Sequence, residues 1–447
     1  MKPKIYTLIA LFAAALVRAA EPPPASDAAT NRLVVTPAFI NQLADELRTN
    51  HPGLRAADAR ALAAGLNVAA VRRWEDPTVS LGGVAATPRG PMLSEEGDLV
   101  YGVEQKLPLF GKPQAARRVA EAEAATATAN TTYQFQVLRS DFAKTAFAAA
   151  LADSVVAIGE QDLGWLDTMV ATTEQRYRAG DGTLVELLRV QNERAKRAEQ
   201  LRTDRRLLEH AHFTLNRLLN RELRAPWPRF DLPPVAGPVA YSTQLVNFAM
   251  KYEPKIKVMG QEIKQAEALA EATRRSRRPD LSVGVEGRQY SGDAGFREGM
   301  LTLSLSLPWV NADKYRSDLK RDQARLKATE FDLAQDELQV REEVHRLTVE
   351  IDAARREAIL YRDEILRRSQ EALASAHAAW IGTRGIFLDL MEARRMFLEA
   401  QLMYARSVAE QYQAMSELVL CCGLGDLEAL QMIGAQRDLE APPETKP

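Results

Sequence analysis

The chain has few of the residues that cross-link small secreted domains. Its 447 residues include only two cysteines, which are neighbours at Cys421 and Cys422. Adjacent cysteines lie too close along the backbone for ordinary disulfide geometry, so no disulfide framework is predicted. We interpret the two thiols as small apolar side chains that close a helix before Gly423.

Motifs for catalysis and for cofactor binding are also absent from the sequence. The closest of the five histidines, His210 and His212, are two positions apart and would point to different sides of a helix. No group of histidine, cysteine and carboxylate residues has metal-ligand spacing, and no phosphate-binding loop or nucleophile elbow occurs. The sequence therefore predicts neither an enzyme nor a resident cofactor or metal.

Aromatic residues make up only 6% of the chain, and the formal net charge is −2 although 26% of residues are charged. This near-neutral balance argues against a nucleic-acid partner. Beyond the N-terminus no segment approaches eighteen consecutive apolar residues, so no membrane-spanning helix is predicted. Abundant alanine, leucine, glutamate and arginine are typical of long helices instead.

Residues 1–19 have the pattern of an export signal. Lys2 and Lys4 precede an apolar run at 5–17, and small residues around Ala19 offer a cleavage site. The run is short for a membrane-spanning helix, which disfavours an uncleaved anchor. A proline-rich linker follows at 20–35, and nothing at the predicted new N-terminus suggests a lipidated cysteine.

The remaining chain is a tandem duplication with a period of about 200 residues. Pro52 and Pro254 are 202 positions apart, and Gly182 and Gly385 are 203 apart. A period of this size indicates a duplicated domain rather than a solenoid of short repeats. We predict a first repeat at 36–225, a linker at 226–241, a second repeat at 242–425 and a tail at 426–447.

Each repeat contains two stretches with the period-two alternation of a strand that has one apolar and one polar face. We predict these strands at about 78–85, 99–107, 281–288 and 300–307. Each run is close to the length that a tilted strand needs to cross a bilayer. The predicted lipid-facing residues are Leu281, Val283, Val285, Leu301, Leu303 and Leu305. The predicted lumen-facing residues, which either tune ion passage or simply keep a water-filled interior wet, are Glu104, Lys106, Glu286 and Arg288.

Long helical stretches lie between the strand pairs. Residues 113–177 contain no proline after Pro113 and carry apolar residues at heptad spacing, as do residues 333–365. Each long helix turns back at a glycine-containing motif and returns as a partner, over about 184–221 and 386–420. Sixty-five helical residues span about 100 Å, far more than a helix of an ordinary globular domain.

The four strands of one chain are too few to close a barrel, which needs about eight. Only closed barrels satisfy the strand edges in lipid. Three chains would supply twelve strands and a wall of long helices. We therefore predict a mainly α protomer whose trimer forms a 12-stranded membrane β-barrel on a long α-helical barrel, with a water-filled export duct inside.

At this level the chain resembles the TolC outer-membrane efflux family over about residues 36–425. The resemblance rests on the signal peptide, the doubled helix–hairpin–helix plan, the Leu-Pro-Leu-Phe-Gly-Lys junction at 107–112 and the Tyr-Arg-Ala-Gly turn at 177–180. The junction is most similar to the heavy-metal (cobalt-zinc-cadmium) efflux branch. The resemblance implies a homotrimer in the outer membrane, extending into the periplasm, that docks on a periplasmic adaptor and an inner-membrane pump of the resistance-nodulation-division type.

The resemblance also points to the two helical turns as the periplasmic mouth and the adaptor-docking surface. The matching residues are Gly180, Asp181, Gly182, Thr183, Gly382, Thr383, Arg384 and Gly385. Asp181, Glu186 and Asp389 are candidate gate acids, because a trimer repeats each as a ring of three carboxylates. In the plainer alternative the glycines only turn the chain and the acids only cap the returning helices.

Two functions are compatible with these patterns. The first is a passive outer-membrane conduit of a tripartite efflux system, with heavy-metal cations as one candidate substrate class. The second is a soluble periplasmic coiled-coil scaffold or adaptor whose hairpins pair with a partner. Duplicated hairpins with membrane-length apolar alternation favour the conduit. The sequence does not specify the substrate, because the pump of such a system selects it.

Overall fold

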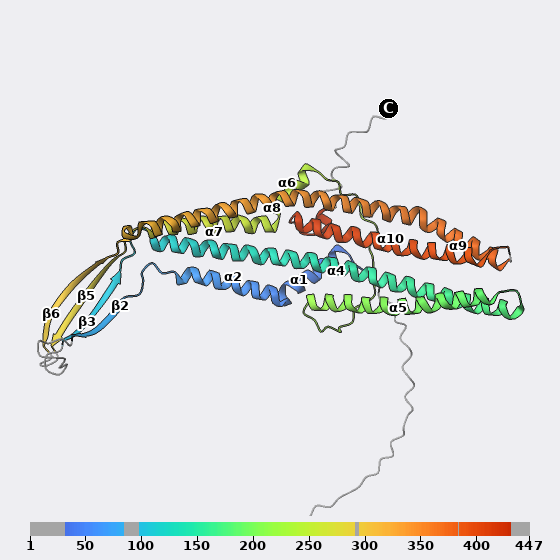
Figure 1. Cartoon of the computed structure of the whole chain (residues 1–447), viewed down its shortest axis with the longest axis horizontal. Helices are drawn as coiled ribbons and strands as arrows, with labels where there is room; N and C mark the ends of the chain where they lie inside the picture. The colour runs from blue at the N-terminus through green and yellow to red at the C-terminus, as the bar shows by residue number, and fades with distance from the viewer. Residues whose placement is uncertain (1–31, 85–97, 291–294, 383, 431–447) are drawn as a thin grey trace, which may run out of the picture.

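The computed structural model describes residues 32–84, 98–290, 295–382 and 384–430, so the predicted signal peptide lies outside the described residues. The molecule is elongated, with its strands at one end and two helical turns at the other (Figure 1). In chain order the elements are β1 (Leu33–Val34), α1 (Pro37–Asn50), α2 (Pro52–Ala70), β2 (Thr78–Val84), β3 (Asp98–Lys106), α4 (Lys112–Ala179), α5 (Leu184–Leu218), β4 (Phe230–Asp231), α6 (Thr243–Tyr252), α7 (Pro254–Ser276), β5 (Leu281–Tyr290), β6 (Phe296–Leu305), a 3-10 turn (Pro308–Asn311), α8 (Ala312–Leu360), a π-helical turn (Tyr361–Ile365), α9 (Leu366–Ile381) and α10 (Phe387–Cys421).

Four strands form one antiparallel sheet in the order β2-β3-β5-β6, which joins the hairpins of the two repeats through β3 and β5. The outer strands β2 and β6 leave one free edge each within the protomer. These two edges run in opposite directions, so a β6 edge of one copy can pair with a β2 edge of the next in the same antiparallel pattern.

The boundaries of the last strand, β6, differ from those expected. The sequence predicts a strand at 300–307, whereas β6 begins at Phe296, where it pairs with Gln289 beyond a register shift. It ends at Leu305, because Leu307 leads into the 3-10 turn that begins at Pro308. Charged and glycine residues near 296–299 hide the alternation from the sequence.

The predicted long helices are present. The stretch predicted at 113–177 is a single helix, α4, of 68 residues. Its counterpart in the second repeat is broken into α8 and α9 by one π-helical turn, which the heptad pattern does not predict. One described helix, α4, contains a window apolar enough to cross a membrane by length and composition, but half of that window is buried within the protomer.

The main core lies near the middle of the molecule, where both repeats contribute. Buried side chains of α4, α8 and α10 meet there, among them Phe147, Ile351 and Met415. Beside this core β1 pairs in parallel with β4, so the two predicted linkers contact each other. Two-residue strands carry no periodic pattern, and the sequence therefore does not predict this pairing.

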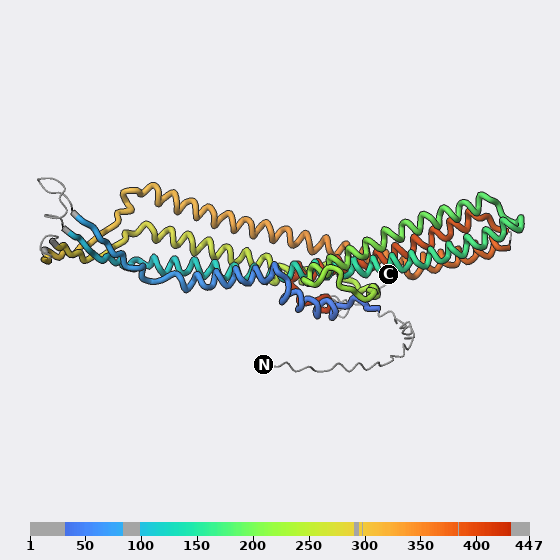
Figure 2. The backbone as a smooth tube through the Cα atoms, turned by 90° about the horizontal axis from the view of Figure 1, so that it is seen from below, coloured from blue at the N-terminus to red at the C-terminus, as the bar shows by residue number. Residues whose placement is uncertain are grey.

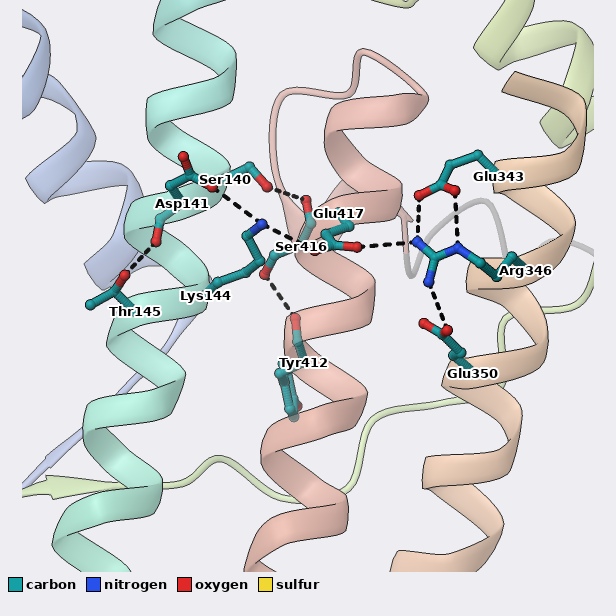
Figure 3. Close-up of polar contacts among 10 residues, drawn as sticks. All are labelled: Ser140, Asp141, Lys144, Thr145, Glu343, Arg346, Glu350, Tyr412, Ser416 and Glu417. Atoms are coloured by element: carbon teal, nitrogen blue, oxygen red, sulfur yellow. Dashed lines mark hydrogen bonds and ion pairs between the residues drawn. The ribbon is translucent and has the colours of Figure 1, made fainter. Parts of the chain in front are cut away.

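Ionic contacts link the same three helices near the core (Figure 3). Glu417 on α10 accepts from the Lys144 ammonium on α4 at 3.0 Å, and its other oxygen lies 3.4 Å from the Arg346 guanidinium on α8. One carboxylate therefore bridges the first repeat and both long helices of the second.

The two cysteines lie where the sequence predicts them. Cys421 is the last residue of α10, and both thiols are buried. Gly423 follows with a φ of +60°, and an added Cβ there would lie 2.1 Å from the Tyr252 carbonyl oxygen. Only glycine fits this close approach, so the prediction of a glycine-terminated helix is confirmed.

Candidate functional site

One face of the sheet is apolar and exposed. Strand register pairs the predicted lipid-facing residues with one another across β5 and β6: Leu281 with Leu305, Val283 with Leu303, and Val285 with Leu301. The same face continues on β3 and β2, where Val103 pairs with Val79. Leu301 is 76% exposed and Leu303 is 67% exposed. A continuous exposed apolar face is the reverse of a water-soluble sheet and fits contact with lipid.

The opposite face gathers the predicted lumen-facing residues. The strand register pairs Glu286 with Gly102 and Glu104 with Gly284. It also places Arg288 and Lys106 on the same side of the sheet. An added Cβ at Gly102 would lie 2.7 Å from the Glu286 side chain. Glycine therefore makes room for a charged side chain on this face of the sheet.

The two cations of this face are held by acids. The Lys106 ammonium lies 2.8 Å from the Glu75 carboxylate, and the Arg288 guanidinium donates to Glu298 at 3.0 Å. These pairs lie toward opposite ends of the sheet, because β3 and β5 are antiparallel. The polar face thus combines charge of both signs with glycine and serine, a lining suited to water-filled space.

The first helical turn joins α4 to α5 through a glycine in the left-handed region. Gly180 has a φ of +82°, and the N–H groups of Asp181 and Gly182 donate to the Arg176 carbonyl oxygen at 2.9 and 3.1 Å. The Thr183 hydroxyl accepts from the Glu186 N–H at 3.2 Å and so caps α5. The turn is closed at both helix ends by local hydrogen bonds.

The second turn repeats part of this design. The N–H groups of Arg384 and Gly385 both donate to the Ala379 carbonyl oxygen at 3.0 Å. An added Cβ at Gly385 would lie 2.9 Å from the Ala379 methyl, so this glycine is needed for the close approach. Helix α10 begins after Ile386, which has no side-chain cap. Thr383 lies outside the described residues.

The two turns are packed against each other. Trp380 is only 2% exposed and belongs to an apolar cluster with Phe387 and Leu390 of the second turn and Leu166 of α4. The Arg176 guanidinium donates to the Trp380 carbonyl oxygen at 2.6 Å and lies over its ring, 4.4 Å from the centroid. Arg176 therefore joins the first turn to the second.

A buried ion cluster lies further from the turns and also joins the two repeats. Asp162 on α4 accepts two hydrogen bonds from Arg394 on α10, at 2.8 and 2.7 Å, and Arg197 on α5 lies 3.3 Å away. The Asp162 and Arg394 side chains are each 8% exposed. No periodic pattern in the sequence predicts this cluster. Its one signal is an arginine beside the apolar positions Leu390 and Ala393.

The candidate gate acids are not gathered into one site within a protomer. Asp181 and Asp389 are exposed and Glu186 is half-buried. Among the described residues none of the three has an ion-pair partner, and the cap of α5 is the Thr183 hydroxyl rather than an acid. Neither Glu186 nor Asp389 caps a helix through a side-chain hydrogen bond. Both lie in the first turn of a helix, α5 or α10, where a negative charge is favourable, and the capping alternative holds only in this sense.

The described part of the chain contains no group of three or more histidine, cysteine or acidic residues that could hold a metal ion. The adjacent thiols are also poor ligands. Burial raises the pKa of Cys422 to about 12, and burial together with its neighbour Cys422 raises the pKa of Cys421 well above its usual range. Both thiols therefore stay protonated, which disfavours metal binding and nucleophilic chemistry.

Comparison with known proteins agrees with this geometry. Residues 43–221 and 245–424 match the family described as Outer membrane efflux protein. The fold is similar to VceC from Vibrio cholerae (17% identity, 87% of this chain and 97% of VceC, TM-score 0.72). It is also similar to CusC (17% identity, 88% and 94%, TM-score 0.75) and to the MtrE outer membrane channel of Neisseria gonorrhoeae (18% identity, 86% and 89%, TM-score 0.69). A sequence comparison with curated proteins finds no match.

The family match covers both repeats, and the likeness to solved structures confirms the predicted TolC-like protomer. The soluble scaffold is not favoured, since the family is one of transport proteins of the outer membrane. The chain belongs to the outer membrane efflux protein family, and it is an outer-membrane channel of a tripartite efflux system that extends into the periplasm.

Proposed function

We propose that this chain forms a passive homotrimeric duct that carries heavy-metal cations from a periplasmic adaptor and an inner-membrane pump to the outside, and that it catalyses no reaction. The observation that carries the proposal is the polarity of the sheet, whose exposed side is apolar and whose other side carries Glu104 and Glu286. Three such sheets would enclose polar space within lipid. Lys106 and Arg288 on the same side are paired with Glu75 and Glu298, so Glu104 and Glu286 would attract cations to the pore.

The helical turns are the proposed docking surface and mouth. They lie at the end of the molecule opposite the sheet, as Figure 2 also shows, and α4 alone spans about 100 Å. Gly180, Asp181, Gly182 and Thr183 of the first turn, with Gly382, Arg384 and Gly385 of the second and the undescribed Thr383, would contact the adaptor. Exposed backbone and side chains at such a turn suit docking of another helical protein.

Asp181, Glu186 and Asp389 are the proposed gate acids. Each would recur three times around the mouth, and none is neutralised by an ion pair among the described residues. Unpaired carboxylates in a narrow ring favour cations over anions. The MtrE structure is of an open state, so at least one channel of similar fold changes its opening.

Planar-bilayer recording of the purified trimer tests the gate acids. Changing all three, D181N with E186Q and D389N, should lower the ratio of cation to anion permeability at least about threefold. Glu330→Gln on α8, an exposed acid far from the turns, is the control and should leave the ratio unchanged. An unchanged ratio in the triple variant would remove the gate role.

The substrate class is tested in a strain that lacks this protein. The proposal predicts increased sensitivity to zinc, cobalt, cadmium or copper, restored by the wild-type chain. Sensitivity to detergents and dyes without any change toward metals would contradict the metal assignment and leave the duct itself intact.

The domain division is part of the same proposal. Removal of residues 1–19 would leave a mature chain that begins in the linker at 20–35, followed by the repeats at 36–225 and 242–425, the linker at 226–241 and the tail at 426–447. The intact mass of the protein isolated from the outer membrane measures the cleavage point directly.

A further inference from the structure

Four short connections join the strands to the helices, at 71–77, 107–111, 277–280 and 306–311. Figure 1 shows all of them at one level of the molecule, between the sheet and the helical part. Strands β3, β5 and β6 are nine or ten residues long, which is the length of a tilted membrane-spanning strand. The connections therefore lie at the periplasmic surface of the outer membrane.

Large apolar side chains are exposed at this level although they do not belong to the strands. The exposed fractions are 51% for Trp74, 45% for Phe110 and 57% for Trp309. The other three tryptophans of the chain are half-buried or buried, so both exposed tryptophans lie here. Exposed tryptophans are enriched at membrane–water interfaces, because the ring is apolar and its N–H is polar.

Positive charge is concentrated at the same level. The stretches 71–76, 106–118, 271–280 and 306–316 hold twelve lysines and arginines but only five acids, whereas the whole chain has a formal charge of −2. A trimer would repeat this excess three times around the barrel. A basic belt directly beside a membrane-spanning segment attracts anionic lipid headgroups.

Two of the five acids at this level pair with lysines, and the other three pair with arginines: Asp76 with Arg72, Glu271 with Arg275 and Asp313 with Arg316. Asp280 lies 2.8 Å from the Lys112 ammonium, and Glu75 lies 2.8 Å from the Lys106 ammonium. The arginines outside these pairs are the remaining charge. Among the described residues Arg73, Arg277 and Arg278 are exposed and have no acidic partner. Arg278 lies over the Phe110 ring, 5.8 Å from its centroid.

A cleft of about 270 Å³ opens between the 71–77 connection and the start of α4. Arg72 and Arg73 line it together with Leu107 and Leu109, and its two acids, Glu75 and Asp280, are the ones that pair with lysines. A cationic rim above an apolar wall matches the phosphate and the first acyl carbons of a phospholipid.

We propose that this belt binds anionic phospholipids of the periplasm-facing leaflet of the outer membrane, with the headgroup phosphate held by Arg73 at the cleft and by Arg277 and Arg278 beside it. Trp74 and Trp309 would lie at the headgroup level and fix the depth of the barrel. The inference rests on the outer-membrane placement of the family and not on the identity of the exported substrate.

Native mass spectrometry of the full-length trimer tests the belt, with phosphatidylglycerol and phosphatidylcholine added in turn. The wild-type trimer should retain phosphatidylglycerol in preference to phosphatidylcholine. Each belt arginine changed to glutamine should weaken phosphatidylglycerol retention about fivefold, and R73Q with R277Q and R278Q should abolish the preference. The control R205Q with R206Q changes two exposed arginines on α5, far from the belt, and should retain lipid as the wild type does.

Equal retention of the two lipids by the wild-type trimer would overturn the proposal, as would equal retention by the belt variant and the control. A second measurement needs no variant: preferential retention by the wild type should fall as salt rises, because surface charge is screened. Retention that does not change with salt would mean that acyl packing, and not the arginines, holds the lipid, and would also overturn the proposal.

Discussion

At the strand end of the molecule one whole sheet face of apolar side chains points outward, whereas at the helical turns an apolar cluster around Trp380 is buried between the helices and Ile386 and Leu388 remain exposed. Leu301 is 76% exposed on the sheet, but Leu390 near the second turn is fully buried. Leucine is thus exposed at one end of the molecule and buried at the other. The difference teaches that the turn end buries an apolar core of its own, whereas the sheet leaves its apolar face for a neighbour outside the protomer, which we propose is lipid.

The two ends also use charge differently. In the helical half that carries the turns the Asp162–Arg394 pair is enclosed within the protomer, while on the sheet Glu104 is exposed on the side opposite the apolar face. A buried pair costs desolvation and stabilises only when both partners are present. Charge at the turn end therefore holds two repeats together, and charge at the strand end lines a space.

The largest expected effect comes from breaking the turn end. Arg394→Ala leaves Asp162 buried with only the longer Arg197 contact, and we expect about 3–5 kcal/mol loss of local stability. Limited proteolysis at the turns should speed up accordingly. Arg395→Ala, the exposed neighbour, should change the cleavage rate little. Equal rates in the two variants would show that the buried pair does not join the repeats.

The second effect tests the strand end. Leu303→Arg places a charge in the middle of the lipid-facing side and should cost about 2–4 kcal/mol, which blocks insertion. Ser304→Arg, one position along, points to the polar side and should be tolerated. The amount of each variant in the outer membrane measures the difference, and similar amounts would mean that the two faces are assigned the wrong way round.

A smaller effect compares the two turns. Thr183→Ala removes the only side-chain cap of α5 and should lower stability by about 1 kcal/mol. Ile386→Thr should act in the opposite direction by a similar amount, because Ile386 has extended backbone, is 68% exposed and offers no cap. Thermal unfolding of each variant gives the sign, and two changes of the same sign would contradict this account of the caps.

The last effect is a pH dependence of a site that lies between the two ends. Burial, with the nearby Asp336 carboxylate, raises the pKa of Glu253 to about 7 from a reference of 4.5. The folded state therefore holds this proton more tightly, and its contribution to stability is present below about pH 4.5 and is lost as pH rises through 7. Glu253→Gln should flatten the dependence of the melting temperature on pH in this window. An unchanged slope would show that Glu253 does not titrate there.

Periodic features of the fold were predictable from the sequence. The heptad spacing of apolar residues predicted α4, and the period-two alternation predicted the two faces of the strands. The repeat of about 200 residues predicted two similar halves. The turn at Gly180 was predictable as well, because a glycine after a long helix commonly adopts the left-handed conformation that ends the helix.

Contacts between the repeats were not predictable, since no local pattern records them. Arg176 bonds to Trp380 across 204 positions, and Asp162 to Arg394 across 232. The π-helical turn at Tyr361–Ile365 was missed because its residues keep the heptad spacing of their neighbours. At the candidate site, sequence located the turns and the acids, while the contacts that hold the turns together required the structure.

The central claim is that the exposed face of the sheet meets lipid in a closed barrel built by three copies. Fractionation of cells that express the mature chain, followed by gel electrophoresis with and without heating, tests it most directly. The account predicts an outer-membrane protein that migrates as a trimer until it is heated. Recovery of the chain as a soluble periplasmic monomer would contradict it.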